Sequence, residues 1–144
     1  FAFAFDEPLS HLAYAAADFI LVPSMFEPCG LTQMISMRYG AVPVVRATGG
    51  LRDTIFDVDN EKDRAAWEVD GSTDWKQTGD ATNGFSFEGT DIGGLEYALD
   101  RALDSYYNDR VWFRKFQERI MRQDWSWNRP ALDYVELYYS AIRS

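Results

Sequence analysis

Short apolar runs separated by longer amphipathic segments organise this sequence. Four runs lack charged residues, as strands buried on both faces do, and they cover residues 1–5, 19–23, 42–45 and 84–87. Elsewhere apolar residues recur every three or four positions, which predicts helices over residues 8–17, 31–38, 91–106, 109–123 and 130–142, with a short one from residue 51. Strands that alternate with helices predict an α/β fold, a Rossmann-like parallel sheet with flanking helices.

Local signals support several helix ends. Pro8 and Pro130 suit first helical turns, because proline lacks the N–H that would be unpaired there. Gly40 is a typical stop signal, and Asp91 is a typical N-cap. Residues 57–83 break the pattern, since they are rich in Asp, Glu, Gly, Thr and Asn. That composition predicts a long surface loop.

The size and charge of the chain exclude several classes of function. A chain of 144 residues predicts one core. Its net charge of −9 argues against nucleic acid and anionic membranes as partners. No apolar stretch reaches the roughly 18 residues that a membrane span requires. Cys29 and His11 are the single cysteine and histidine, so we expect no internal disulfide, no histidine-rich metal site and a reducing compartment.

The most informative stretch is Phe26-Glu27-Pro28-Cys29-Gly30-Leu31-Thr32-Gln33, which joins the run 19–23 to the helix 31–38. A helix start presents unpaired N–H groups that bind phosphates. A carboxylate beside a phosphate is repelled by it, so Glu27 needs another role. Accepting hydrogen bonds from hydroxyls of a neutral group attached to the phosphate is one such role.

Two other positions leave alternatives open. Cys29 precedes a helix, where its pKa would be lowered for nucleophilic attack, but a small buried thiol in a pocket wall is the favoured interpretation. Gly49 and Gly50 follow Thr48 and permit a close backbone approach, although a plain strand-to-helix turn is the alternative. We interpret His11 as a structural rather than a catalytic histidine.

Four motifs in order resemble the starch synthases and bacterial glycogen synthases, and residues 127–134 are most similar to a plant or algal starch synthase of the third type. The motifs are Phe5-Asp6-Glu7-Pro8-Leu9-Ser10-His11, Ser24-Met25 with the stretch 26–33, Thr48-Gly49-Gly50-Leu51 with Asp53-Thr54, and Asp124-Trp125-Ser126-Trp127. The sequence departs from the family at Ala47, where a basic residue is usual, and at Ile35, where many related transferases carry a second Glu.

The resemblance implies a retaining glucosyltransferase that moves glucose from ADP-glucose to the non-reducing end of an α-1,4-glucan, without a cofactor or metal. It implies that Glu27 is catalytic, and it implies substrate-binding roles for Phe5, Cys29, Gly30, Leu31, Thr32, Gln33, Thr48, Gly49 and Gly50. Phe5 would stack on adenine, with a core strand residue as the alternative.

The resemblance also implies that residues 1–144 form part of the C-terminal, nucleotide-sugar-binding lobe of a GT-B glycosyltransferase. The terminal helix, 128–144, would return towards an N-terminal lobe that the chain lacks, and the isolated chain would be inactive. A plastid or chloroplast location follows if the plant or algal likeness holds. The alternative function is a non-catalytic module that binds glucan or protein.

Overall fold

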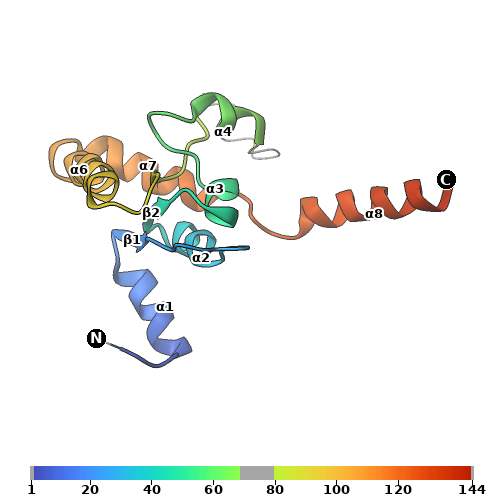
Figure 1. Cartoon of the computed structure of the whole chain (residues 1–144), viewed down its shortest axis with the longest axis horizontal. Coiled ribbons are helices and arrows are strands. Elements are labelled where there is room, and N and C mark those ends of the chain that lie inside the picture. Colours follow the sequence, from blue (N-terminus) through green and yellow to red (C-terminus); the bar gives the residue numbers. More distant parts are fainter. Residues whose placement is uncertain (1, 69–79, 144) are drawn as a thin grey trace.

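A three-stranded parallel sheet forms the centre of the computed structural model, which describes residues 2–68 and 80–143 (Figure 1). The strands are β1 (Phe19–Val22), β2 (Val42–Arg46) and β3 (Phe85–Phe87), and they lie in that order. Phe19 pairs with Val42, and Val44 pairs with Phe85. The predicted α/β class and the last three predicted strands are therefore confirmed.

Seven helices accompany the sheet in the described part of the chain. They are α1 (Glu7–Ala16), α2 (Thr32–Tyr39), α3 (Gly49–Thr54), α4 (Lys62–Glu68), α6 (Ile92–Asn108), α7 (Arg110–Arg122) and α8 (Asn128–Arg143). Asp6, Asp91 and Asp109 cap α1, α6 and α7 by accepting hydrogen bonds from backbone N–H groups. Gly40 ends α2 in the left-handed region, at φ 79°, as the sequence predicts.

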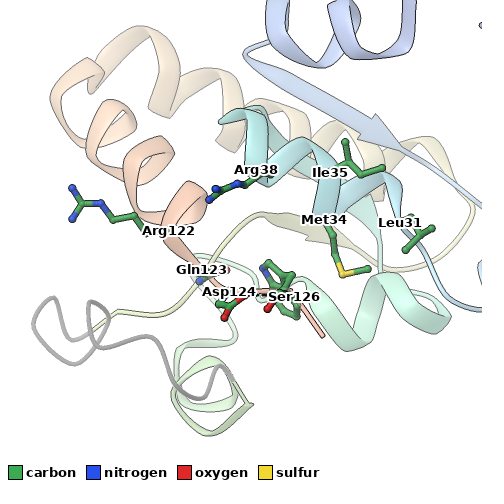
Figure 2. A pocket seen from close by; sticks show the side chains of 9 residues that line it. Leu31, Met34, Ile35, Arg38, Arg122, Gln123, Asp124 and Ser126 are labelled. Atoms are coloured by element: carbon green, nitrogen blue, oxygen red, sulfur yellow. Dashed lines mark hydrogen bonds between the residues drawn. The ribbon is translucent and has the colours of Figure 1, made fainter. Parts of the chain in front are cut away.

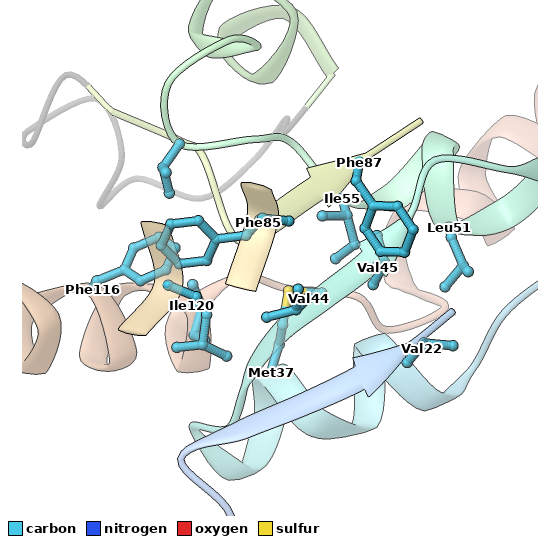
Figure 3. Packing of buried hydrophobic residues seen from close by; sticks show 14 of the residues in the cluster. Val22, Met37, Val44, Val45, Leu51, Ile55, Phe85, Phe87, Phe116 and Ile120 are labelled. Carbon is cyan, nitrogen blue, oxygen red and sulfur yellow. The ribbon is translucent and has the colours of Figure 1, made fainter. Parts of the chain in front are cut away.

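Helices on both sides of the strands bury the core (Figure 3). α2 packs on β1 and β2, α6 packs on β3 and β2, and α7 contacts both helices. Val44 on the central strand lies among Met37, Phe85 and Ile120 in Figure 3, and all four side chains are buried.

The first predicted strand is wrong. Residues 2–5 form no strand, and Phe3 and Phe5 are 95% and 91% exposed. A strand is stable only with a neighbour to hydrogen-bond, and β1 pairs with β2 alone in the described sheet. The outer edge of β1 is thus free in the described sheet, and residues 2–5 do not pair with it despite their apolar alternation.

The predicted surface loop 57–83 is only partly correct. Lys62–Glu68 form α4, and Ala65 on that helix packs in a second small core with Phe56 and Ala81. Asp57, Thr82 and Asn83 are buried as well. Residues 69–79 lie outside the described residues. The prediction of a surface loop failed in part because the polar side chains in this stretch form hydrogen bonds with residues elsewhere in the chain. These bonds allow the side chains to be buried.

A buried ion pair holds the start of this stretch against β3 and α6. Arg101 on α6 donates to both carboxylate oxygens of Asp57, each at 2.9 Å, and to Asp59 at 2.6 Å. Asp57 also accepts the backbone N–H of Ser86 on β3 at 2.7 Å. The side chain of Asp57 is 1% exposed and that of Arg101 is 16% exposed. The pair thus joins three segments that are distant in sequence.

The two charges hold one another ionised. Burial raises the pKa of Asp57, but the hydrogen bonds from Arg101, Ser86 and Asp59 outweigh burial and leave the pKa below its ordinary value. Burial lowers the pKa of Arg101, but its bonds to Asp57 and Asp59 outweigh that effect and raise the pKa. Both side chains therefore remain charged throughout the neutral range.

Two helices extend away from the body of the molecule. Figure 1 shows α1 and α8 protruding from it in different directions. α1 buries no residue and contacts α2, where His11 Nδ1 lies 2.7 Å from the hydroxyl of Tyr39. α8 exposes a run of apolar side chains, namely Leu132, Val135, Leu137, Tyr138, Tyr139 and Ile142. Among the described helices, none is both long enough and apolar enough to cross a membrane.

Replacing Arg101 with Met should lower the free energy of unfolding by about 3–5 kcal/mol, because Asp57 would be left as a buried charge without its cation. Urea denaturation of the protein that contains this chain measures the loss. Arg52→Met is the matched control, since its ion pair with Glu88 is exposed on both sides, and we expect a change within about 0.5 kcal/mol. Equal losses in the two variants would contradict the role of the buried pair.

Stability should also fall in acid through Asp57. Because its folded-state pKa is lowered, its contribution is complete above the unfolded-state value of about 3.9 and is lost as the pH falls through the folded-state value. Urea midpoints measured from about pH 5 to pH 3 should decline, and the decline should be shallower in Asp57→Asn. An equally steep decline in that variant would assign the acid sensitivity to other carboxyl groups.

Candidate functional site

The two motifs predicted to carry chemistry meet at the carboxyl edge of the sheet. Residues 23–31 follow β1, and Ala47 and Thr48 follow β2. Since β1 and β2 are parallel, both segments emerge at the same edge, which is where ligands bind in open α/β sheets. The backbone N–H of Gly50 donates to the carbonyl of Glu27 at 2.9 Å and joins the two segments directly.

Gly49 and Gly50 permit this approach because they lack a side chain. A Cβ atom on Gly49 would lie 1.9 Å from the Glu27 carbonyl oxygen, and one on Gly50 would lie 1.6 Å from the Cys29 carbonyl oxygen. Gly49 also has φ +47°, in the left-handed region. The close backbone approach, rather than a plain turn, is therefore what the two glycines provide.

Glu27 lies at this junction and is partly buried. Its Oε2 accepts a hydrogen bond from the Ser24 hydroxyl at 3.2 Å. Its backbone carbonyl is held by Gly50, so the position of the main chain is fixed while the carboxylate retains further acceptor capacity. This carboxylate can accept hydrogen bonds from hydroxyl groups of a ligand.

The start of α2 is a site suited to an anion. Its N-cap residue, Leu31, makes no side-chain capping bond, so the first N–H groups of the helix are not satisfied by a cap. The Thr32 side chain, in the first turn, forms no hydrogen bond to another described residue. Gly30 precedes the helix with φ +72° and is buried. The N–H groups of the helix and the Thr32 hydroxyl can together bind a phosphate.

Arg46 supports the same edge, a role that was not predicted from the sequence. From the end of β2 its guanidinium donates to the backbone carbonyls of Met25 at 2.8 Å, Ser24 at 3.3 Å and Gly89 at 2.5 Å. These carbonyls belong to the segments that follow β1 and β3. Arg46 therefore holds the loops together, and a basic residue one step before Ala47 serves the chain itself.

Two further predicted residues lie differently from the expectation. Cys29 is exposed, so the prediction of a buried thiol is wrong; the segment packs on Gly50 through its carbonyl group instead. Phe5 is not in a core strand, and Figure 1 shows its segment at the end of α1 that points away from the sheet. His11 contacts Tyr39 at the end of α2, whereas Cys29 lies before the start of that helix. His11 is therefore not a partner for Cys29, which fits its interpretation as a structural residue.

Gln33 is fully buried and binds groups of the chain. Its Nε2 donates to the Gly30 carbonyl and to the Thr54 hydroxyl, both at 2.9 Å. Thr54 was not among the predicted site residues, although it belongs to the sequence motif that begins at Thr48. Gln33 and Thr54 thus connect the two motifs from behind.

A separate hollow of about 680 Å³ lies between α2 and residues 122–126 (Figure 2). It touches the predicted site only at Leu31, and Glu27 and the two glycines do not line it. Hydrogen bonds from Ser126 hold the pKa of the exposed Asp124 below its ordinary value. The indole N–H of Trp125 is buried and has no partner in the described part of the chain. Residues 124–126 of the motif therefore line a hollow beside α2 that Glu27 does not reach.

Metal-binding residues do not gather in the described residues, which contain no group of three or more His, Cys, Asp and Glu side chains placed to hold an ion. The candidate site thus consists of backbone N–H groups, the hydroxyl of Thr32 and the carboxylate of Glu27.

Comparison with known proteins identifies similar sequences. The chain is 61% identical over 137 residues to soluble starch synthase 3, chloroplastic/amyloplastic, of Solanum tuberosum, which covers 95% of this chain and 10% of the relative. It is 48% identical over 134 residues to glycogen synthase 1 of Synechococcus sp. (strain JA-3-3Ab), which covers 93% of this chain and 25% of the relative. The chain thus spans a tenth to a quarter of these relatives. No family model matches it.

Solved structures give the same result. The catalytic domain of starch synthase IV from Arabidopsis thaliana, bound to ADP and acarbose, aligns with a TM-score of 0.80 at 42% identity over 98% of this chain and 26% of that chain. Sucrose-phosphate synthase from Thermosynechococcus elongatus aligns with a TM-score of 0.61 at 23% identity, which supports the fold alone. The α/β fold is that of GT-B glycosyltransferase catalytic domains.

Replacing Gly50 with Ala should destabilise the protein by at least about 2 kcal/mol, because the new Cβ would meet the Cys29 carbonyl, a backbone group that a side-chain rotation cannot move. Gly93→Ala is the control in another helix, since its Cβ would meet a side-chain oxygen of Asp91 at 3.2 Å. We expect Gly93→Ala to change stability by less than about 1 kcal/mol in urea denaturation. Similar behaviour of the two variants would show that the loops are not tightly packed.

Proposed function

Because this chain belongs to the starch and glycogen synthase family, we propose that it is the donor-binding part of a longer glucosyltransferase. This enzyme transfers glucose from ADP-glucose to the non-reducing end of an α-1,4-glucan with retention of configuration. The observation that carries the proposal is the Gly50 N–H to Glu27 carbonyl bond, which holds the Glu27 segment where it leads into the uncapped start of α2. A sugar nucleotide combines both matching groups, since its phosphates carry charge and its sugar carries hydroxyls.

Each group at the junction has a role in this transfer. The N–H groups at Gly30, Leu31 and Thr32, with the Thr32 hydroxyl, bind the diphosphate and stabilise it as it leaves. Glu27 accepts hydrogen bonds from the sugar and favours the positive charge that develops on its ring. Thr48, Gly49 and Gly50 line the phosphate side. Cys29, which is exposed and lies two residues after Glu27, forms part of the sugar pocket wall.

The acceptor belongs to a second lobe in this proposal. The apolar side of α8 is exposed along the helix, and an N-terminal lobe of the same protein would cover it. Transfer needs donor and acceptor together in a water-poor cleft, so the isolated chain is inactive. The relative from Arabidopsis thaliana bound ADP and acarbose, which supports an adenine nucleotide and a glucan as ligands here. The names of the plant relatives support a plastid location.

The exposed rings of α8 favour one other candidate function. The ring of Tyr134 contacts those of Trp127 and Tyr138, and all three side chains are exposed. Aromatic surfaces of this kind stack on sugars or bind proteins. A non-catalytic module would bind glucan without transferring glucose. Incubating the intact enzyme with radiolabelled ADP-glucose or UDP-glucose and a maltooligosaccharide separates the two functions and the two donors.

Glu27→Gln in the intact enzyme should lower kcat by at least about 100-fold, because the change preserves shape and removes the charge that stabilises the transition state. The KM for ADP-glucose should change little, since the diphosphate is bound by the start of α2. Steady-state kinetics with a maltooligosaccharide acceptor measure both values.

Glu88→Gln is the matched control for this variant. Glu88 follows β3, is exposed and pairs with Arg52, so we expect kcat within about twofold of wild type. A near wild-type kcat in Glu27→Gln would remove this carboxylate from the mechanism.

A further inference from the structure

A continuous chain of hydrogen bonds runs behind the candidate site. The Gly30 carbonyl accepts from Gln33 Nε2 at 2.9 Å, the same Nε2 donates to Thr54 Oγ1 at 2.9 Å, and Thr54 Oγ1 donates to the Gly50 carbonyl at 2.6 Å. Gln33 and Thr54 are 21 residues apart in sequence. This series of hydrogen bonds therefore connects the segment that precedes α2 with the first turn of α3.

The chemistry of the groups fixes the direction of each bond. A carbonyl only accepts, so the Thr54 proton goes to Gly50, and Oγ1 must then accept from the amide. The Gly30 carbonyl also only accepts, so both protons of Gln33 Nε2 are used. A flipped amide would place Oε1 against the Gly30 carbonyl, which only accepts. The orientation with Nε2 towards Gly30 and Thr54 is therefore the favourable one.

This orientation leaves an oxygen without a bond. Gln33 Oε1 is buried and has no hydrogen-bond partner in the part of the chain that the structure describes. An unpaired buried acceptor is unfavourable for folding, so the amide would be a poor choice if its task were only to fill space. What the Gln33 side chain contributes to the structure is therefore the two hydrogen bonds that its Nε2 donates. Because Gln33 is 0% exposed, it does not present a surface to a ligand.

We propose that Gln33 and Thr54 are positioning residues for glucosyl transfer, which fix the start of α2 against the Gly49–Gly50 turn. The inference rests on the proposed function, and it deepens the role of that site. Without these bonds, the direct links between the two segments are the Gly50 N–H to Glu27 bond and backbone contact, while Arg46 holds only residues 24 and 25 of the first segment. The Gln33–Thr54 pair thereby sets the place of Glu27 relative to the N–H groups of α2.

Such a pair acts on the transition state more than on binding. The N–H groups and the carboxylate stabilise developing charge only while they are held in place before the reaction begins. A small displacement between them weakens that stabilisation. The diphosphate still meets a helix start, so donor binding is affected less.

Thr54→Val in the intact enzyme tests the proposal. The substitution preserves shape and removes the hydroxyl, so kcat should fall at least about tenfold while the KM for ADP-glucose changes less than about threefold. Thr54→Ser retains the hydroxyl and should restore most of kcat. Gln33→Met combined with Thr54→Val should lose no more than Gln33→Met alone, since both residues act through one chain of bonds.

Thr82→Val is the matched control, because Thr82 is also buried and hydrogen-bonded, to Asp80 and Arg119, away from the site. It should lower the Tm and leave kcat unchanged. If Thr54→Val retains wild-type kcat, or if Thr82→Val lowers kcat as much as Thr54→Val does, the positioning role is overturned.

Amide hydrogen exchange separates this proposal from the proposed function. Exchange at residues 27–33 should accelerate in Thr54→Val, return towards wild type in Thr54→Ser and stay unchanged in Thr82→Val. If the wild-type enzyme transfers no glucose from ADP-glucose, the proposed function fails, but the exchange result still tests the connection. Unchanged exchange in Thr54→Val overturns the pair as a positioning device whatever the enzyme's activity.

Discussion

The candidate site depends on contact between two backbones. Gly49 and Gly50 lie so close to the carbonyls of Glu27 and Cys29 that no side chain fits between them. This contact turns two separate strand-to-helix connections into one surface, with Glu27 on one side and the Thr48 turn on the other. Arg46 fastens the surface from the end of β2, and Gln33 with Thr54 fastens it from behind. The hydrophobic core fixes the strands, whereas the two glycines allow the Glu27 segment and the Thr48 turn to lie against each other.

Much of the fold could be predicted because its signals are local. Parallel strands, the caps at Asp91 and Gly40 and the helix start beside Glu27 each follow from a few adjacent residues. The errors arose where the outcome depends on distant partners. Residues 1–5 have the alternation of a strand, yet residues 2–5 do not pair with the free edge of β1. Asp57 reads as a loop residue, yet Arg101, 44 positions away, allows it to be buried.

The predictions for the candidate site divide in the same way, into local motifs that were found and tertiary contacts that were not. The motif Glu27-Pro28-Cys29-Gly30 and the turn Thr48-Gly49-Gly50 were found from sequence, because adjacent residues define each of them. The exposure of Cys29, the carbonyl-binding role of Arg46 and the bond between Gln33 and Thr54 were not. All three depend on which way a side chain points after two loops meet. A single sequence records which residues could bond, but the tertiary contact decides which do.

The electrostatics of the site explain why it would need help from elsewhere in a longer protein. A diphosphate carries more charge than the partial positive charge of one short helix can offset. One cation close to the junction in sequence is already engaged, since Arg46 binds the backbone carbonyls of Ser24, Met25 and Gly89. The chain as a whole carries a net charge of −9. We therefore expect the described residues to orient a nucleotide sugar through backbone groups, while cations from another part of the protein neutralise its phosphates.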